Sequence, residues 1–447
     1  MTLIRRWRVV YWIIRDIAVR YTRFLILGFL IGLGVMLASG RLLPLVRARW
    51  LVPVERIGLV GEFTPSSLPS GIQSLISIGL TTLDEDGSVH PGLATWWEAT
   101  DSGKRYIFHL DDDASWHNGR RFTSHDVNYN INNVVITPID EMNVSVSLEN
   151  PYSPLPALLS KPLFRNGLVG LGPYKVDKLQ LNGDRIRSIR LIPIKSNTTA
   201  TVRQYTFYQT EAAAIMGYKQ GEVDILEDIT NPTELVNWSN TEISERINYS
   251  RIITLFFNVR SEFLSDRTNR QALAFGLPEF AETAALSPIS LKSWAYSDDV
   301  KQYESNTEQA RKVFKEFRTG TASAEIILST FPSYLDIAQA IADSWTGLGL
   351  TTGVKVENEV STQYMALLSA IDVPPDPDQY VFWHSTQTAT NITGYSNAKI
   401  DKLLEDGRQE MNPETRKNIY ADFSRRLVDD APALFLYYAK TYTISRS

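Results

Sequence analysis

The sequence contains no cysteine among its 447 residues. Disulfides, thiol nucleophiles, thiolate metal sites and a lipid attached through an N-terminal cysteine are therefore excluded. Positive charge is also outnumbered by negative charge beyond the first 50 residues. Those residues hold nine arginines and one aspartate, so residues 51–447 carry a net charge of −13, against −5 for the whole chain. An acidic body repels phosphate backbones, which argues against nucleic acid as a partner.

One uncharged run lies near the N-terminus, FLILGFLIGLGVMLASG at residues 24–40. Arg41 can direct its charge to the membrane surface and residues 42–46 extend the apolar length, so residues 24–46 are predicted to form one transmembrane helix in the lipid bilayer. Six arginines precede the run, and the positive-inside rule then predicts a cytoplasmic N-terminus and a periplasmic or extracellular body. The alternative is a signal peptide cleaved near residues 38–40.

The remaining chain is long enough for two domains, and its C-terminal half alternates helix and strand patterns. A helix capped by Asn306, a strand at 326–328, a helix ending at Gly347 and a strand at 354–356 predict parallel crossovers in an α/β fold. Further predictions are a strand at 380–383, a helix that starts after Asn412 and a strand at 433–438.

The most informative stretch is residues 79–133, where short strands alternate with turns. It contains in order the sequences LDEDG, PGLA, WEAT, DSGK, FHL, WHNG and TSHDV. Together these resemble the signature of the extracellular solute-binding proteins that serve peptide and nickel importers, often called family five. GLGPY at 170–174 and GEVDI at 221–225 also match that family's motifs. So many ordered matches are far more specific than a lone glycine motif.

The resemblance implies a two-lobed α/β fold of the periplasmic-binding-protein type II, following the transmembrane helix. Residues 1–51 are the expected basic leader and anchor, residues 52–254 with 431–447 a discontinuous lobe I, and residues 255–430 lobe II. The buried strand at 255–259 is expected to be one of two crossovers between the lobes. Hinge motion at the crossovers would close the lobes around a ligand.

The resemblance also points to ligand contacts. In peptide receptors of this family an aspartate near the sequence IDVPPDPD pairs with the ligand's α-amino group, so either Asp372 or Asp376 is the expected partner. A buried ammonium needs such a carboxylate, since an unpaired buried charge is costly. Further candidate ligand-binding residues are Phe63, in the loop after the first strand, Asn258 on the crossover, and Trp383 and Ser385 on a strand edge. The competing interpretations are a solvated Asp/Pro loop and core packing of Trp383.

Other functions have weaker support in the sequence. Ser396 and Lys399 form an S-x-x-K pattern, but the other motifs of penicillin-binding enzymes are absent, so no catalytic residue is expected. Three of the five histidines are eight residues apart without a reason to converge, so no metal or cofactor is expected. The predicted function is a membrane-anchored, substrate-binding protein of an ABC importer, with a peptide or similar small solute and the permease subunits as partners. The alternative is an anchored sensor or scaffold without a transporter.

Overall fold

The computed structural model describes residues 53–195, 201–315, 325–359 and 363–446, with residues 12, 15, 19–23 and 28 near the N-terminus. Apart from Gly28, the predicted membrane segment lies outside the described residues. Within the described part, no helix combines the length and the apolar character that crossing a membrane requires. The chain divides into two compact units, residues 1–55 with 195–203, and a body of residues 56–194 with 204–447.

A ten-stranded sheet organises the body, with strand order β14-β13-β15-β12-β16-β11-β1-β10-β9-β8. Its two longest strands, β12 (Thr241–Phe257) and β16 (Ala433–Arg446), which we call the central strands, are fourth and fifth in this order and pair antiparallel from Thr241 opposite Arg446 to Phe256 opposite Ala433. The other strands are β14 (Thr351–Val356), β13 (Glu325–Thr330), β15 (Ala366–Asp372), β11 (Ile225–Ile229), β1 (Val54–Val60), β10 (Val202–Tyr208), β9 (Arg185–Pro193) and β8 (Tyr174–Asn182). Both central strands therefore run through the two halves of the sheet.

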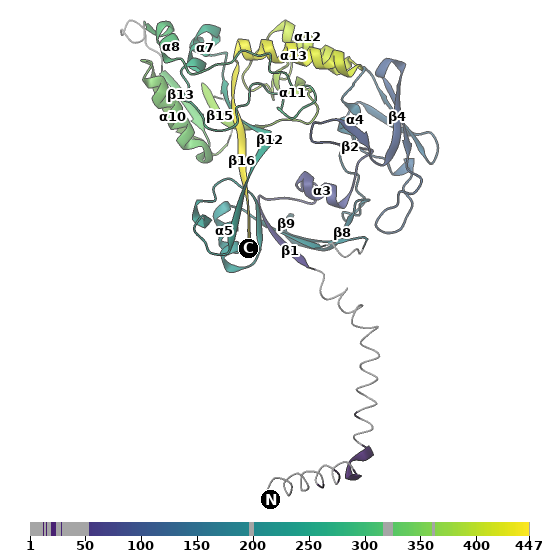
Figure 1. Cartoon of the computed structure of the whole chain (residues 1–447). Coiled ribbons are helices and arrows are strands. Elements are labelled where there is room, and N and C mark those ends of the chain that lie inside the picture. Colours follow the sequence, from purple (N-terminus) through teal and green to yellow (C-terminus); the bar gives the residue numbers. More distant parts are fainter. Residues whose placement is uncertain are drawn as a thin grey trace, which may run out of the picture. The chain divides into compact units, whose positions relative to one another are not determined.

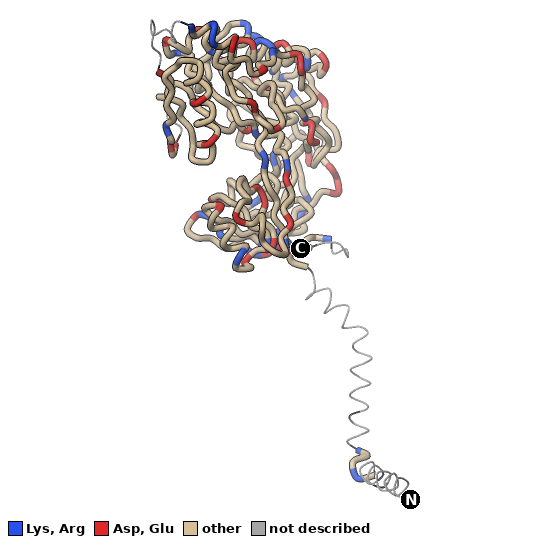
Figure 2. Tube along the Cα trace, turned by 60° about the vertical axis from the view of Figure 1, so that its left-hand side comes forward, with Lys and Arg blue, Asp and Glu red and all other residues tan. Residues whose placement is uncertain are grey.

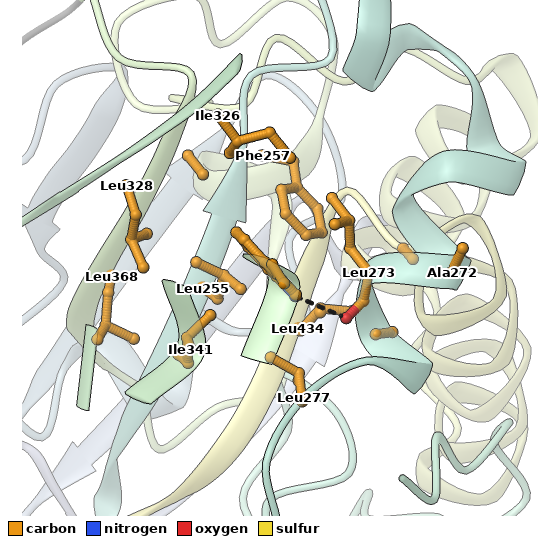
Figure 3. Close-up of a cluster of buried hydrophobic side chains, with 14 of the residues drawn as sticks. Leu255, Phe257, Ala272, Leu273, Leu277, Ile326, Leu328, Ile341, Leu368 and Leu434 are labelled. Carbon is orange, nitrogen blue, oxygen red and sulfur yellow. Dashed lines mark hydrogen bonds between the residues drawn. The ribbon is translucent and has the colours of Figure 1, made fainter. Parts of the chain in front are cut away.

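The half that contains β13, β14 and β15 is the predicted α/β region. β13 pairs parallel with both β14 and β15, which confirms the predicted crossovers. The helices here are α6 (Glu262–Ser265), α7 (Arg267–Phe275), α8 (Thr307–Val313), η4 (Pro332–Tyr334) and α10 (Leu335–Thr346). Asn306 caps α8 by accepting a hydrogen bond from the Gln309 amide, as predicted. Leucine, isoleucine and phenylalanine side chains from the strands and α7 fill one core, where the Trp345 indole donates to the Leu273 carbonyl at 3.1 Å (Figure 3).

The other half carries two smaller helices and a second sheet. α3 (Ser70–Ile76) packs on β8 and β9, and α5 (Glu211–Gln220) packs on β11 (Figure 1). A four-stranded sheet has the order β4-β5-β7-β6 and its own core. Its strands are β4 (Ala94–Thr100), β5 (Arg105–Leu110), β7 (Asn143–Leu148) and β6 (Val134–Pro138); nearby lie β2 (Thr81–Leu83), β3 (Val89–Pro91), α4 (Leu155–Leu158), η1 (Asp101–Gly103) and η2 (Ser124–Asp126), and η3 (Thr233–Leu235) follows β11.

Three helices near the C-terminus reach the four-stranded sheet from the other half of the body: α11 (Tyr380–Trp383), α12 (Ala398–Gln409) and α13 (Pro413–Asp430) (Figure 1). The Ser153 amide donates to the Arg408 carbonyl at 2.7 Å, at the end of α12. Gly87 has φ +81°, and a Cβ there would lie 2.2 Å from the Pro375 carbonyl oxygen, so glycine allows this close approach. The two halves are thus joined by the central strands and also touch at a second place.

Two sequence predictions need correction. Residues 380–383 form the helical turn α11 and not a strand, because the amides of Trp383 and His384 turn back to the carbonyls of Gln379 and Tyr380. The long strand β12 begins at Thr241, well before the predicted strand at 255–259, and Asn258 follows its end. The polar first half of β12, TEISERINYS, lacks the apolar run that identified its second half.

Candidate ligand-binding site

Asp372 lies where the two halves of the body meet. It ends β15 and sits directly opposite Arg251 of β12, close to the register shift that breaks the β12–β16 pairing between Asn248 and Ile252. Arg251 donates to both oxygens of Asp372, at 2.7 and 3.3 Å, while the two side chains stay 44% and 74% exposed. The hydrogen bond with Asp372 raises the pKa of Arg251, with a smaller contribution from the charge of Asp228 on β11. The crossover therefore presents one cation and one anion to solvent.

Asp376 has a different environment, although it lies only four residues further on. Its carboxylate receives two hydrogen bonds from the Arg416 guanidinium, at 2.5 and 2.8 Å, and a third from the Asp378 amide. The two charged side chains are 14% and 7% exposed. Burial lowers the pKa of Arg416, but the hydrogen bond and the charge of Asp376 outweigh it and hold that pKa above its ordinary value. The carboxylate of Asp376 is thus already neutralised and well supplied with donors.

A pocket of about 360 Å³ lies beside Asp376, between the four-stranded sheet and α13. Aromatic and apolar side chains from both halves of the body line it: Trp97, Tyr106, Trp294 and Met411. The Tyr106 hydroxyl is 3.6 Å from the Met411 sulfur, and burial raises the pKa of Tyr106 to about 12. This pocket can take an apolar group, and its charged lining consists of the Asp376–Arg416 pair and Glu410.

A second buried pair fixes the same loop and was not anticipated from the sequence. The Arg408 Nε donates to both oxygens of Asp378 at 3.0 and 2.9 Å, and its guanidinium lies 3.9 Å from the centre of the Tyr380 ring. Tyr380 stacks in turn on His384, with ring centres 4.0 Å apart. Asp378 and Arg408 are thirty residues apart, so only the fold brings them together. Two arginines from α12 and α13 thereby hold the loop of residues 374–378 in place.

The other predicted ligand-binding residues have internal partners. Half-buried Phe63 packs edge-on against Phe207 at 5.1 Å, and the Asn258 side-chain amide donates to the Tyr364 carbonyl at 2.9 Å. Trp383 is 1% exposed in a core with Phe435. Neither it nor Ser385 lies on a strand edge: Trp383 ends α11. Ser385 follows that helix and binds Asp401 of α12 through its amide and hydroxyl, at 2.9 and 2.7 Å.

The described residues do not assemble the serine-enzyme site or the metal site that the sequence analysis weighed as alternatives. Ser396 is exposed in the turn before α12. Among the described residues, no three histidines or acidic residues gather in a way that could hold a metal ion. Lysines and arginines alternate with acidic residues over most of the body (Figure 2).

Comparison with known proteins identifies the family. The model of the bacterial extracellular solute-binding proteins, family 5, matches residues 88–147 and 134–391, which is more than half of the chain. The oligopeptide-binding protein AppA of Bacillus subtilis is 21% identical over 86% of this chain and 86% of its own length. The dipeptide-binding protein of Escherichia coli is 20% identical over 92% of this chain and 94% of its own.

Solved structures show the same fold. NikZ from Campylobacter jejuni in complex with Ni(L-His) is 20% identical, with a TM-score of 0.72 over 89% of this chain and 94% of that one. AppA from Bacillus subtilis in complex with a nonapeptide is 18% identical, with a TM-score of 0.68 over 88% of this chain and 95% of that one. The two-lobed α/β periplasmic-binding fold predicted from the sequence is therefore confirmed. The chain belongs to the bacterial extracellular solute-binding proteins of family 5, and it is a binding protein and not an enzyme.

Proposed function

We propose that this protein is the substrate-binding component of an ABC importer and that it captures peptides between its lobes. Two of the relatives named above, AppA and the Escherichia coli protein, are by name oligopeptide- and dipeptide-binding proteins, and this chain covers most of their length. The observation that carries the proposal is the exposed Arg251–Asp372 pair at the crossover. A peptide carries an ammonium, a carboxylate and polar backbone groups, so a site that offers both charges side by side complements it.

Asp372 is the proposed partner of the peptide's α-amino group, in preference to Asp376. Its side chain is 74% exposed, and in the described structure Arg251 is its only side-chain hydrogen-bond donor, so the carboxylate keeps lone pairs for a second cation. Asp376 already accepts three hydrogen bonds in a buried pair. Its role in this proposal is to hold the loop that ends at Asp378. Phe63, Asn258, Trp383 and Ser385 then support the cleft walls.

Closure of the lobes is part of the proposal. Lobe I comprises residues 52–254 with 431–447, and lobe II residues 255–430. Among the described strands, β12 and β16 connect them along the sheet, and the pairing of these two strands is irregular between Asn248 and Ile252. A bulge of this kind bends a strand locally and is a suitable place for hinge motion.

The proposal also includes a membrane anchor. Residues 24–46 form the transmembrane helix, the arginine-rich N-terminus stays in the cytoplasm, and the body works on the periplasmic or extracellular side, next to the permease. Protease added to spheroplasts tests this topology. It should remove the body and leave a short protected N-terminal fragment, whereas a fully protected body would contradict the anchor.

Native mass spectrometry of the purified full chain tests the ligand class. The protein should carry co-purified molecules that fragment as peptides. A nickel complex or another solute in their place would contradict the peptide assignment. A protein that stays empty and binds no member of a peptide library would favour a scaffold.

A further inference from the structure

The β8–β9 hairpin, residues 174–193, differs from the rest of the body in charge. It contains five cations, Lys175, Lys178, Arg185, Arg187 and Arg190, against two aspartates, a net charge of +3. Residues 51–447 together carry −13. β8 is also the last strand of the ten-stranded sheet, so the hairpin forms an exposed edge.

The hairpin has one covered face and one open face. Ile186, Ile189 and Leu191 are buried against Ile72 and Ile76 of α3. Within the described body, no helix covers the opposite face of β8 and β9 (Figure 1). That open face carries the cations, with Lys178 and Arg190 opposite each other, whereas Leu179 and Leu181 lie opposite Ile189 and Ile186 on the covered side.

The register places like charges together on the open face. Lys178 lies directly opposite Arg190, a pairing that destabilises a sheet. A register shift between Gln180 and Leu181 lets Arg187 bulge outward, where it is exposed. Asp177 pairs with Arg190 at 3.4 Å, but no ion pair joins Lys175, Lys178 or Arg187 to a carboxylate in the described structure. These three cations are available to an external anion.

The length of the connecting chain limits the distance between this open face and the membrane segment. The proposed transmembrane helix ends at residue 46, and the sheet begins at Val54 of β1, which leaves seven residues between them. Fully extended, these residues span at most ~25 Å. β8 follows β1 by three strand positions, which adds only ~15 Å. If the run is anchored in a bilayer, the hairpin therefore stays within reach of the lipid head groups.

We propose that the open face of the β8–β9 hairpin docks on the anionic lipid surface of the membrane that holds the chain. This inference rests on the anchor of the proposed function and goes beyond it, because it assigns the body an orientation. Three cations on an exposed sheet edge, without a carboxylate partner among the described residues, suit a head-group layer, where each nearby cation is attracted to anionic lipid. Docking through this face would leave the α12 and α13 side of lobe II away from the bilayer.

The absence of cysteine makes a direct test possible. The full chain, with Gln180→Cys on the open face as its only thiol, is labelled with a fluorescent donor and reconstituted into nanodiscs whose lipids carry an acceptor head group. Energy transfer should be at least about twofold higher in nanodiscs that contain phosphatidylglycerol than in purely zwitterionic ones. Roughly 0.5 M sodium chloride should abolish the difference. A donor at Glu308→Cys, on α8 of lobe II, should respond to neither change.

Charge reversal provides the matched comparison. Lys175→Glu, Lys178→Glu and Arg187→Glu together should remove the dependence on anionic lipid. Lys312→Glu, Lys399→Glu and Lys417→Glu change the net charge equally on exposed positions of lobe II and should leave it intact. Equal energy transfer from the Gln180→Cys donor in both kinds of nanodisc would overturn the inference and would favour a protein partner for this face. Failure of the chain to enter nanodiscs would overturn the anchor as well, while loss of peptide binding with intact lipid dependence would contradict only the proposed function.

Discussion

Asp372 ends β15 and Asp376 lies four residues further on, in the loop that follows, yet the two carboxylates have different environments. Asp372 shares an exposed pair with Arg251, whereas Asp376 is enclosed with Arg416. The sequence predicted that an aspartate of this segment matters, but it could not separate the two. Their partners are 121 and 40 residues away, and only the folded sheet and α13 bring them near.

Asp376→Asn should destabilise the protein strongly. The substitution leaves the Arg416 guanidinium buried without its anion, which costs about 3 kcal/mol or more. Urea denaturation of wild type and variant measures the loss. Asp112→Asn is the matched control, because Asp112 forms an exposed pair with Arg121 and should matter by less than ~0.5 kcal/mol. Equal, small effects of the two substitutions would show that the buried pair contributes little.

His117 should make stability depend on pH. Burial lowers the pKa of His117 from its ordinary 6.5, although the hydrogen bond to the Gly172 carbonyl partly opposes this. Because the folded state binds the proton less readily than the unfolded state, stability is fully present above the unfolded pKa. It is lost as the pH falls through the folded pKa.

The free energy of unfolding of the wild type, measured by urea denaturation from about pH 7.5 to 5, should decline more steeply than that of His117→Asn. His125→Asn serves as the control, since His125 is exposed and forms no ion pair in the described structure, and its curve should run parallel to that of the wild type. Parallel curves for all three proteins would rule out His117 as the source.

Among the secondary-structure elements, those with local signals were predicted and those set by distant contacts were not. Helix caps and helix ends depend on a few neighbouring residues, and the structure confirms the caps at Asn306 and Asn412 and the helix end at Gly347. The four apolar residues of α11 fit a strand equally well by pattern, and contacts with Arg408 and His384 favour the helical turn. The first half of β12 is polar and lacks the apolar pattern of a strand. It is held in the sheet by pairing with β16, which comes from the far end of the chain, so its sequence alone did not predict it.

The cap of α13 should contribute measurably to stability. The Asn412 side chain accepts the Thr415 amide, which would otherwise lack an intrahelical partner. Asn412→Ala should cost about 1 kcal/mol in urea denaturation. Asn418→Ala, in the middle of the same helix and exposed, should cost nothing or stabilise slightly. If Asn418→Ala costs as much as Asn412→Ala, the cap has no special role.

For the molecule as a whole, the family motifs at 79–133 predicted the two-lobed fold, and the structure and its neighbours confirm it. The contacts between the lobes did not follow from the sequence. The approach of Gly87 to Pro375 and of Ser153 to Arg408 joins segments more than 200 residues apart. Motifs identify the family of a fold, but such pairings depend on the exact length of every intervening turn.

Closure of the lobes predicts a compaction on binding. Small-angle X-ray scattering of the detergent-solubilised chain should give a smaller radius of gyration with a bound peptide than after its removal. The measurement uses a peptide identified by native mass spectrometry, and a scrambled peptide that does not bind serves as the control. An unchanged radius at saturating peptide would indicate a rigid receptor.

Calorimetry with free and N-acetylated forms of one peptide tests the central claim, that Asp372 receives the peptide's amino group. Asp372→Asn should weaken binding of the free peptide by ~2 kcal/mol, roughly 30-fold, because the ammonium loses its anion. Asp299→Asn, which alters a similarly exposed pair with Arg425, should not. Acetylation should weaken binding to the wild type strongly and to Asp372→Asn little, so that the two changes are not additive. Unchanged affinity in Asp372→Asn, or equal affinity of the wild type for both peptides, would contradict the account.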